Sequence, residues 1–371
     1  MRVVLSGGGT GGHVYPALAI AEQLRKEYPE AQFLYIGTSS GLESGIVSRS
    51  GLDIPFEAIP ISGFKRRLTF DNVKTVMRFF GGIRRSKALM TAFRPDFAIG
   101  TGGYVCGPVL YAAAKMGVPT LVHEQNVIPG LTNKFLSRYV DTIAVSFSGS
   151  EQQFPAAKRA VFTGNPRATT VSQANPEDGW RSLGLPSGRQ LVVVVGGSGG
   201  ARAINEAMIG MAPLVGRLSD TSFLYVTGQR YYEETSRRIR ELALPDDGQL
   251  MVMPYVDNMP EVLAASSLVV NRSGASTMAE LTALGIPAIF IPSPNVTNNH
   301  QEKNARLLEK EDAARVLLES ELTGERLFEE IEAIMTNSFR REEMASASRR
   351  LGTPDSAQRL VDELLRLRHK R

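Results

Sequence analysis

Arg2-Val3-Val4-Leu5-Ser6-Gly7-Gly8-Gly9-Thr10-Gly11-Gly12 is a short apolar run that ends in a glycine-rich loop. A helical period follows, because Val14, Leu18, Ala21 and Leu24 recur at spacings of four, three and three. The same succession returns at Leu191-Val192-Val193-Val194-Val195, which leads into Gly196-Gly197-Ser198-Gly199-Gly200. Two openings of strand, glycine loop and helix predict two doubly wound, Rossmann-like α/β domains.

Further β-rich runs follow each opening and alternate with helical segments, which predicts two parallel sheets wrapped by helices. The predicted strands are 32–36, 97–99, 120–122 and 142–145 in the first half, and 223–226, 250–253, 268–270 and 288–291 in the second. The polar stretch 164–188 is expected to contain the linker, so the predicted domains are 1–164 and 165–353. The last helical segment, 354–371, is expected to pack back on the first domain.

Length and composition agree with two soluble domains and exclude several other classes of protein. The chain has 371 residues, of which 43% are hydrophobic and 22% charged, so it is not intrinsically disordered. The 35 glycines follow no collagen period, and no apolar run is long enough to span a membrane. Cys106 is the single cysteine, which excludes an intrachain disulfide, and no signal peptide opens the sequence. We therefore expect a cytoplasmic protein.

Positive charge is concentrated in one segment of the chain. Between residues 63 and 87 there are eight Lys and Arg residues against Asp71 alone, which gives a local net charge of +7. The whole chain carries only +4, so the remainder sums to −3. A local basic patch of this kind indicates an acidic partner or an anionic surface.

The same segment also predicts an amphipathic helix over residues 72–85. Val73, Val76, Met77 and Phe80 fall at i, i+3, i+4 and i+7, on one helix face. The expected membrane patch comprises Lys74, Met77, Arg78, Phe79, Phe80, Ile83, Arg84 and Arg85. An interfacial helix has such a composition, but a doubly wound domain also needs helices that pack on its own sheet. Both roles are compatible if Phe79 and Ile83 point outward.

Glycine loops at strand ends indicate a phosphate-binding protein, although each loop alone is also compatible with a tight turn. Gly7, Gly9 and Gly12 match the dinucleotide fingerprint, but the second strand offers no carboxylate for a ribose before Glu43. This argues against a dehydrogenase, and no P-loop motif occurs. Because ligands of doubly wound sheets bind at the carboxyl ends of strands, we expect a cleft between two facing domains.

A second candidate phosphate site lies where a strand meets a helix at Asn271-Arg272-Ser273-Gly274-Ala275-Ser276-Thr277-Met278-Ala279-Glu280. Ser273 or Ser276 is positioned to cap this helix, whose free N–H groups would favour a pyrophosphate. Glu280, one turn further, could accept both hydroxyls of a ribose or could simply complement the helix dipole.

Five motifs that occur in a fixed order give a specific prediction of the protein family. They are Gly8-Gly9-Thr10-Gly11-Gly12-His13, Gly100-Thr101-Gly102-Gly103-Tyr104, His123-Glu124-Gln125-Asn126 with Gly130-Leu131-Thr132-Asn133, Gly197-Ser198-Gly199-Gly200-Ala201-Arg202, and the segment 273–280. Together they resemble the bacterial lipid-linked peptidoglycan N-acetylglucosaminyltransferases, the MurG family, over residues 2 to about 308. The resemblance implies the GT-B glycosyltransferase fold, with two Rossmann-like domains facing across a cleft.

The resemblance also implies the reaction and its participants. The family transfers N-acetylglucosamine from UDP-N-acetylglucosamine to the C4 hydroxyl of the muramoyl sugar of lipid I, with inversion, and so makes lipid II. It implies a hexosyltransferase at the inner face of the cytoplasmic membrane, with anionic lipids and other cell-wall synthesis and division proteins as partners. No D-x-D triplet occurs, so we expect no dedicated metal site and no cofactor.

Site residues follow from matching the motifs position by position. Donor contacts are implied for Thr10, Gly11, Gly12, Asn126, Arg167, Ser198, Val256, Ala275, Ser276, Thr277, Glu280 and Gln301. Among these, Arg167 and Ser198 belong with the diphosphate, Val256 with uracil and Glu280 with the ribose. The lipid diphosphate is placed against Gly8, Gly9, Gly102, Gly103 and Tyr104. The chain departs from the family at His300, where a glutamine is usual before Gln301.

Glycosyl transfer to a hydroxyl needs a base for the acceptor proton and stabilisation of the departing diphosphate. Helix N-termini and Arg167 could stabilise the departing diphosphate. His13, beside the first glycine loop, could be the base. His13 could also merely pack at the start of its helix. Glu124 is the other candidate base, and it could equally be a structural hydrogen-bond acceptor.

Other classes of function remain compatible with parts of this pattern. A UDP-N-acetylglucosamine 2-epimerase would share the fold and the donor but would need no lipid acceptor. A sugar-nucleotide-binding or scaffolding protein without chemistry would not require His13 or Glu280. The basic segment could bind nucleic acid, but no nucleic-acid module motif accompanies it, so no such partner is expected.

Overall fold

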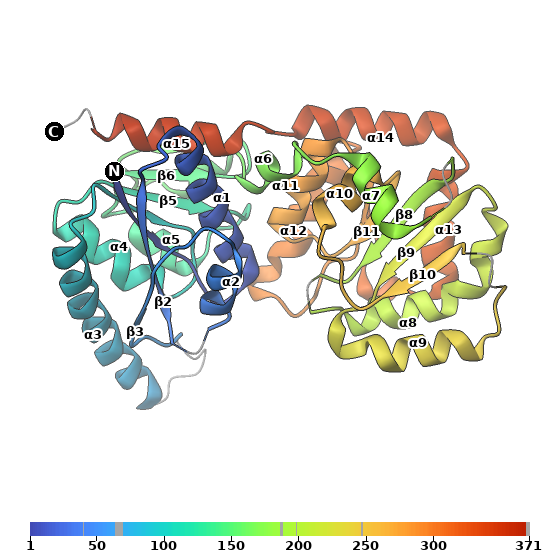
Figure 1. The fold of residues 1–371 in the computed structure, drawn as a ribbon, viewed down its shortest axis with the longest axis horizontal. Helices are drawn as coiled ribbons and strands as arrows, with labels where there is room; N and C mark the ends of the chain where they lie inside the picture. Colours follow the sequence, from blue (N-terminus) through green and yellow to red (C-terminus); the bar gives the residue numbers. More distant parts are fainter. Residues whose placement is uncertain (40, 64–69, 186–187, 198, 246–247, 369–371) are drawn as a thin grey trace. The chain divides into compact units, whose positions relative to one another are not determined.

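The computed structural model describes residues 1–39, 41–63, 70–185, 188–197, 199–245 and 248–368, with the backbone alone at 70–74. It divides into two compact units. Unit 1 is Met1–Thr169 together with Asp355–Arg371, and unit 2 is Thr170–Pro354. Figure 1 shows that each unit is a sheet with helices on both faces.

The described part of unit 1 is built on a seven-stranded parallel sheet in the order β3-β2-β1-β4-β5-β6-β7. Its strands are β1 (Arg2–Ser6), β2 (Gln32–Thr38), β3 (Phe56–Ile59), β4 (Phe97–Gly100), β5 (Thr120–Glu124), β6 (Thr142–Val145) and β7 (Ala160–Phe162). Its helices are α1 (Gly11–Glu27), α2 (Glu43–Arg49), α3 (Phe70–Phe93), α4 (Cys106–Lys115), α5 (Leu131–Leu136) and α15 (Ser356–Arg366). Helix α6 (Arg167–Val171) crosses the boundary between the units.

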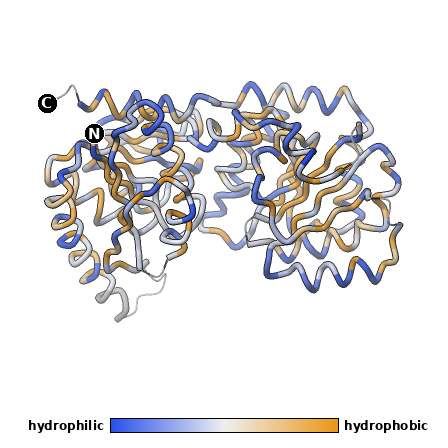
Figure 2. The backbone as a smooth tube through the Cα atoms, viewed as in Figure 1, coloured by the Kyte–Doolittle hydropathy of each residue, from blue (hydrophilic) through white to orange (hydrophobic). Residues whose placement is uncertain are grey.

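Alternation along the strands of unit 1 gives the sheet two apolar faces. Val3 and Leu5 of β1 point to the face covered by α1 and α15, where Leu360 and Leu364 are buried. Val4, between them, points to the opposite face, which α3 and α4 cover. Because both faces are buried, the strands are continuous apolar runs, seen as orange segments in Figure 2.

The described part of unit 2 repeats the design with a six-stranded parallel sheet in the order β10-β9-β8-β11-β12-β13. Its strands are β8 (Gln190–Val195), β9 (Thr221–Val226), β10 (Leu250–Met253), β11 (Leu268–Asn271), β12 (Ala288–Phe290) and β13 (Ala314–Val316). Its helices are α7 (Pro176–Leu183), α8 (Arg202–Met211), α9 (Tyr232–Glu241), α10 (Met259–Ala265), α11 (Ala275–Leu284), α12 (His300–Lys310), α13 (Gly324–Met335) and α14 (Ser338–Leu351).

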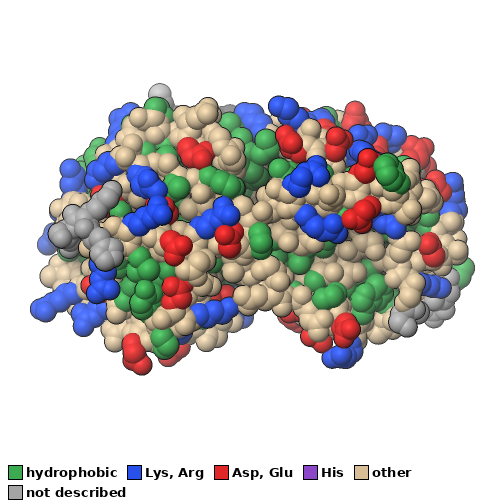
Figure 3. All heavy atoms as spheres, turned by 90° about the horizontal axis from the view of Figure 1, so that it is seen from above, with side chains coloured by type: hydrophobic (Ala, Val, Ile, Leu, Met, Phe, Trp, Pro, Cys, Tyr) green, Lys and Arg blue, Asp and Glu red, His purple; other side chains and the backbone are tan. Residues whose placement is uncertain are grey.

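Helix α15 is held to unit 1 by charge as well as by its apolar face. Arg159, just before β7, makes two hydrogen bonds of 2.8 and 2.9 Å to the carboxylate of Glu363. Figure 3 shows the face of unit 1 that carries α15, where basic and acidic side chains lie next to one another. This mixed surface differs from the strongly basic composition of residues 63–87.

The stretch 164–188 contains α6 and α7. The structure corrects one expectation about local structure. In α3, Val76, Met77 and Phe80 are exposed, whereas Phe79 and Ile83 do not point outward. Phe79 meets Phe135 edge-on at 6.0 Å, and Ile83 packs against the core. The reason is that α3 approaches α4 closely at Gly82, where a Cβ would lie 3.2 Å from Pro108.

Candidate active site

The glycine loops of unit 1 gather at the point where the strand order reverses. Strands β2 and β3 lie on one side of β1 in the sheet, whereas β4 to β7 lie on its other side. Loops leave the carboxyl ends of β1, β4 and β5 side by side, since these strands are neighbours in the sheet. Such a switch point is where doubly wound sheets bind their ligands.

The first two loops are in direct backbone contact. The N–H of Gly8 donates to the carbonyl of Gly102 at 3.2 Å. Gly103 has φ +84°, and a Cβ there would lie 2.2 Å from the carbonyl oxygen of Gly8. Only glycine fits this approach, so the two predicted acceptor-diphosphate loops form one rigid backbone surface.

His13 lies in the first turn of α1 and faces this surface. Its Nδ1 lies 2.8 Å from the carbonyl oxygen of Gly8 and 3.3 Å from Oγ1 of Thr10. A carbonyl only accepts, so Nδ1 carries a proton, and in the neutral form of the ring the lone pair lies on Nε2. Thr101 fixes the backbone beneath, because its hydroxyl donates to the carbonyl of His13 at 2.6 Å. This tautomer is the one a general base acting through Nε2 requires.

Glu124, the other candidate base, is buried at the end of β5 and is surrounded by donors. Its Oε1 accepts from the backbone and side-chain nitrogens of Asn126 at 2.9 and 3.3 Å. Its Oε2 accepts from the N–H of Gly130 at 3.0 Å and from Nδ2 of Asn133 at 2.8 Å. Both oxygens hold the loop 126–130 and the start of α5, which favours the structural alternative for Glu124.

His123, which precedes Glu124 in β5, is completely buried. Its Nε2 donates to the carbonyl of Gly164 at 3.0 Å, and its Nδ1 accepts from Nε2 of Gln125 at 3.1 Å. Burial lowers the pKa of His123 to about 4, so the ring is neutral at physiological pH. It ties the end of β5 to the segment that leads out of unit 1.

Glu43 has a role that the motifs did not predict. Its carboxylate turns inward and accepts from the N–H of Thr38 at 2.9 Å and from the N–H of Gly9 at 3.5 Å. The side chain is fully buried beneath the first loop. Its position in the sequence, five residues after the end of β2, did not predict these hydrogen bonds. They depend on where α2 places its first residue relative to the glycine loop, which is a tertiary contact.

The other predicted residues of unit 1 lie around the same loops. Thr10 is the N-cap residue of α1 and makes no side-chain capping bond, so the first N–H groups of the helix keep no side-chain acceptor there. Tyr104 is partly exposed. Its ring lies beside Gly9, because a Cβ built on Gly9 would be 3.9 Å from Cε1 of Tyr104. Arg167 begins α6, with its guanidinium over the ring of Tyr15.

In unit 2 the predicted phosphate-binding helix is α11, and the prediction of its cap is wrong. The N-cap residue is Gly274, with no side-chain capping bond. Ser273 instead donates to the carbonyl of Gln301 at 2.8 Å, and the Oγ of Ser276 is buried without a partner among the described residues. The uncapped first turn, with Ala275, Ser276 and Thr277, therefore suits an anion.

The remaining predicted donor residues of unit 2 are Glu280, Gln301, Val256 and Ser198. Glu280 is only 9% exposed, and Gln301 lies in the first turn of α12. The amide oxygen of Gln301 accepts from the N–H of Ser293 at 2.8 Å, which orients its NH₂ group. Val256 is buried just after β10. Ser198 lies outside the described residues.

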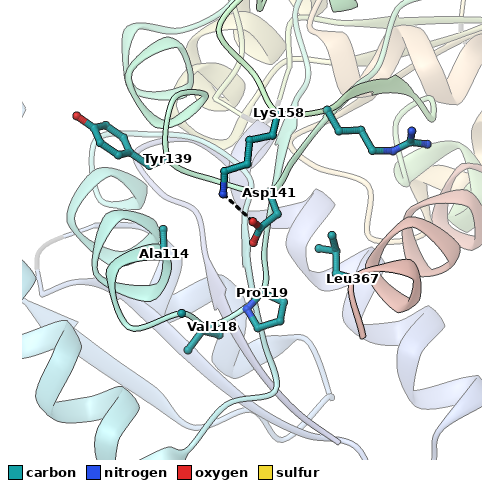
Figure 4. A pocket seen from close by; sticks show the side chains of 9 residues that line it. Ala114, Val118, Pro119, Tyr139, Asp141, Lys158 and Leu367 are labelled. Atoms are coloured by element: carbon teal, nitrogen blue, oxygen red, sulfur yellow. Dashed lines mark hydrogen bonds and ion pairs between the residues drawn. The ribbon is translucent and has the colours of Figure 1, made fainter. Parts of the chain in front are cut away.

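A pocket of about 360 Å³ in unit 1 is a different feature (Figure 4). It is lined at the amino ends of β5 to β7, by Pro119, Asp141 and Lys158 among others. Burial opposes ionisation of Asp141, but hydrogen bonds from Lys158 and Thr120 outweigh it and lower the pKa. The charges of this pocket are paired, and it lies at the opposite sheet edge from the glycine loops.

Comparison with protein families gives matches to both units. Residues 3–145 match the glycosyltransferase family 28 N-terminal domain, and residues 191–360 match the glycosyltransferase family 28 C-terminal domain. The chain belongs to glycosyltransferase family 28. The glycine loops of unit 1 and the α11 start of unit 2 lie within the matched segments of this family.

Curated relatives in the family match over the whole chain. A protein of Bacillus cytotoxicus is 52% identical over 370 residues, which are 100% of both chains. One of Halalkalibacterium halodurans is 53% identical and covers 97% of this chain and 98% of its own. Both are named UDP-N-acetylglucosamine--N-acetylmuramyl-(pentapeptide) pyrophosphoryl-undecaprenol N-acetylglucosamine transferase.

Solved structures agree with the family and with the GT-B fold. MurG of Acinetobacter baumannii superposes with a TM-score of 0.76 at 29% identity and covers 98% of this chain and 99% of its own. A UDP-GlcNAc 2-epimerase of Neisseria meningitidis bound to UDP-GlcNAc reaches a TM-score of 0.71 at 13% identity, covering 99% of this chain and 100% of its own. The second likeness shows the shared fold alone.

Proposed function

We propose that this chain is the inverting transferase that moves N-acetylglucosamine from UDP-N-acetylglucosamine to the C4 hydroxyl of the muramoyl sugar of lipid I. The observation that carries the proposal is the match, above 50% identity over the full chain length, to relatives named for this transfer. The two uncapped helix starts and the interlocked glycine loops fit two diphosphate-containing substrates.

The roles of the residues follow from their chemistry. His13 accepts the proton of the acceptor hydroxyl on Nε2, while the C4 oxygen forms the new bond to the anomeric carbon. The bond from that carbon to the UDP oxygen breaks, and the negative charge passes to the diphosphate. The first N–H groups of α11 and the guanidinium of Arg167 stabilise this leaving group. Glu280 binds the ribose and Val256 the uracil.

Replacing Glu280 by alanine should weaken UDP binding by about 1–3 kcal/mol, because hydrogen bonds to a carboxylate are lost. Isothermal titration calorimetry with UDP measures this directly. Glu234→Ala, at an exposed carboxylate on α9, is the matched control and should bind UDP normally. An unchanged affinity of the Glu280→Ala protein would refute the ribose assignment.

Chelation is expected to leave most of the chemical step intact, because no D-x-D motif is present. Among the described residues, no group of three or more His, Cys, Asp or Glu side chains could hold a metal ion. The check is single-turnover transfer with and without EDTA at fixed ionic strength. A rate that collapses with EDTA and returns with Mg²⁺ or Mn²⁺ would contradict this prediction.

We propose that unit 1 docks peripherally on the cytoplasmic membrane through α3. Among the described helices, none is both long and apolar enough to cross a bilayer. Met77 and Phe80 expose 69% and 65% of their surface, and Arg78, Arg84 and Lys87 lie exposed on the same helix. Apolar side chains rimmed by cations suit an anionic interface. Of the expected membrane patch, Lys74 has no described side chain, and residues 65–67 of the basic segment lie outside the described residues.

A variant with Met77→Ser and Phe80→Ser should bind anionic vesicles more weakly than wild type in co-sedimentation. The Arg78/Arg84/Arg85→Glu variant should lose binding further, since each cation near anionic lipid contributes about 1 kcal/mol. High salt should weaken the wild type. Phe339→Ser is the matched control, because Phe339 is 73% exposed on α14 of unit 2. Equal binding of the α3 variants and wild type at low salt would exclude this surface.

A further inference from the structure

The guanidinium of Arg167 is held against one face of α1. Its central carbon lies 5.4 Å from the centre of the Tyr15 ring, within the range of a cation–π contact. Glu22 follows Tyr15 by seven residues, two turns along the same helix face. Neither Tyr15 nor Glu22 belongs to the motifs that carry the family resemblance, so both are additional residues at the site.

Glu22 provides the opposite charge on this face. Partial burial raises its pKa, while the positive charges of Arg167 and Lys26 act in the opposite direction. Its place on the Tyr15 face of α1 puts this carboxylate on the side of the helix that Arg167 approaches. Attraction to a carboxylate on that side restricts where a long, flexible arginine side chain can place its guanidinium.

Tyr15 also touches the first glycine loop. A Cβ built on Gly11 would lie 3.1 and 3.3 Å from two carbons of the Tyr15 ring, so the ring covers that residue directly. The same ring thus contacts the predicted sugar-binding loop and the predicted diphosphate-binding arginine. A side chain that contacts both the first glycine loop and Arg167 can fix the position of one relative to the other within unit 1.

The backbone of Arg167 is fixed from the other side. Its N–H donates to Oδ1 of Asn165 at 3.1 Å, and residues 163–166 before it are buried. His123 holds the carbonyl of Gly164 in the same segment. With the backbone anchored, the remaining freedom lies in the side chain of Arg167, which Tyr15 contacts and which the charge of Glu22 attracts.

We propose that Tyr15 and Glu22 are positioning residues that preorganise Arg167 for the diphosphate of the donor. The contact with the Tyr15 ring restricts where the guanidinium lies, and a guanidinium held in place presents its N–H donors to phosphate oxygens in a fixed geometry. Preorganisation lowers the entropy lost on binding, so it raises affinity without a new contact to the ligand. The inference rests on the proposed function, because it takes Arg167 as a diphosphate contact.

The test compares UDP with uridine, which lacks the phosphates, by calorimetry on the full-length protein. Tyr15→Ala should weaken UDP binding about 3- to 30-fold and leave uridine binding unchanged. Tyr15→Phe should restore the UDP affinity, because it keeps the aromatic face. Glu22→Gln should also weaken UDP alone, whereas Glu27→Gln, at an exposed carboxylate on the same helix, should behave as wild type.

Arg167→Ala separates this inference from the proposed function. It should lower UDP affinity, and adding Tyr15→Ala to it should cost nothing further, because the two residues act as one unit. If Arg167→Ala weakens UDP but Tyr15→Ala does not, or if Tyr15→Ala weakens uridine equally, the positioning role is wrong. If Arg167→Ala leaves UDP affinity intact, the diphosphate assignment itself fails and the positioning role falls with it.

Discussion

His13→Ala is expected to lower kcat by about 10²–10⁴-fold, the usual contribution of a general base. The affinity for UDP should change little, because the uracil, ribose and phosphate contacts are assigned to other residues. The pH profile of kcat should also lose the limb that reports deprotonation of the base. Single-turnover transfer to a lipid I analogue across a pH series measures both effects.

His13→Asn is the control that separates catalysis from loop support. An asparagine amide can still donate to the carbonyl of Gly8, which the Nδ1 of His13 contacts at 2.8 Å, but it cannot take a proton. The asparagine variant should therefore be as slow as the alanine variant. If asparagine restores activity, the role of His13 is to hold the first glycine loop.

Glu124→Ala is expected to lower the free energy of unfolding by about 3 kcal/mol or more and to abolish most transfer. The reason is that four donor contacts lose their shared acceptor, and the Nδ2 of Asn133 is left in a buried site. Chemical denaturation monitored by circular dichroism gives the stability, and the transfer assay gives the activity.

Glu124→Gln distinguishes the two roles considered for Glu124. A glutamine keeps one acceptor oxygen, so part of the stability and activity should return. Its pH profile should keep the limb assigned to His13. A variant with wild-type stability but no measurable kcat, and without that limb, would instead identify Glu124 as the base.

The interior of the fold could be predicted from the sequence because buried parallel strands are continuous apolar runs. The strands around Leu191–Val195 and Phe97–Ile99, for example, were recognisable from such runs alone. Among the described residues, β3, β7 and β13 were not predicted, and all lie at sheet edges. Edge strands are covered on fewer sides, and Phe56–Ile59 and Ala160–Phe162 are mostly half-buried, so their short sequences carry a weaker signal than the central strands do.

The candidate site could be predicted only where a motif fixes the backbone. The glycines of the loops and the start of α11 were found this way, since their spacing follows from strand–turn–helix geometry. Side-chain roles that depend on tertiary contacts were not, and Glu43 and Tyr15 are the clearest examples. The expected caps Ser273 and Ser276 failed for the same reason, because Ser273 bonds to the carbonyl of Gln301 in another helix.

The central claim is the transfer of the sugar to a lipid-linked acceptor, and the rival of the same fold is a UDP-N-acetylglucosamine 2-epimerase. The decisive measurement uses donor labelled in the sugar, incubated with the protein with and without a lipid I analogue. The label should enter the organic phase only when the acceptor is present, and His13→Ala should reduce that transfer. Label that stays in the aqueous phase and appears in a 2-epimer of the donor, with or without acceptor, would contradict the account.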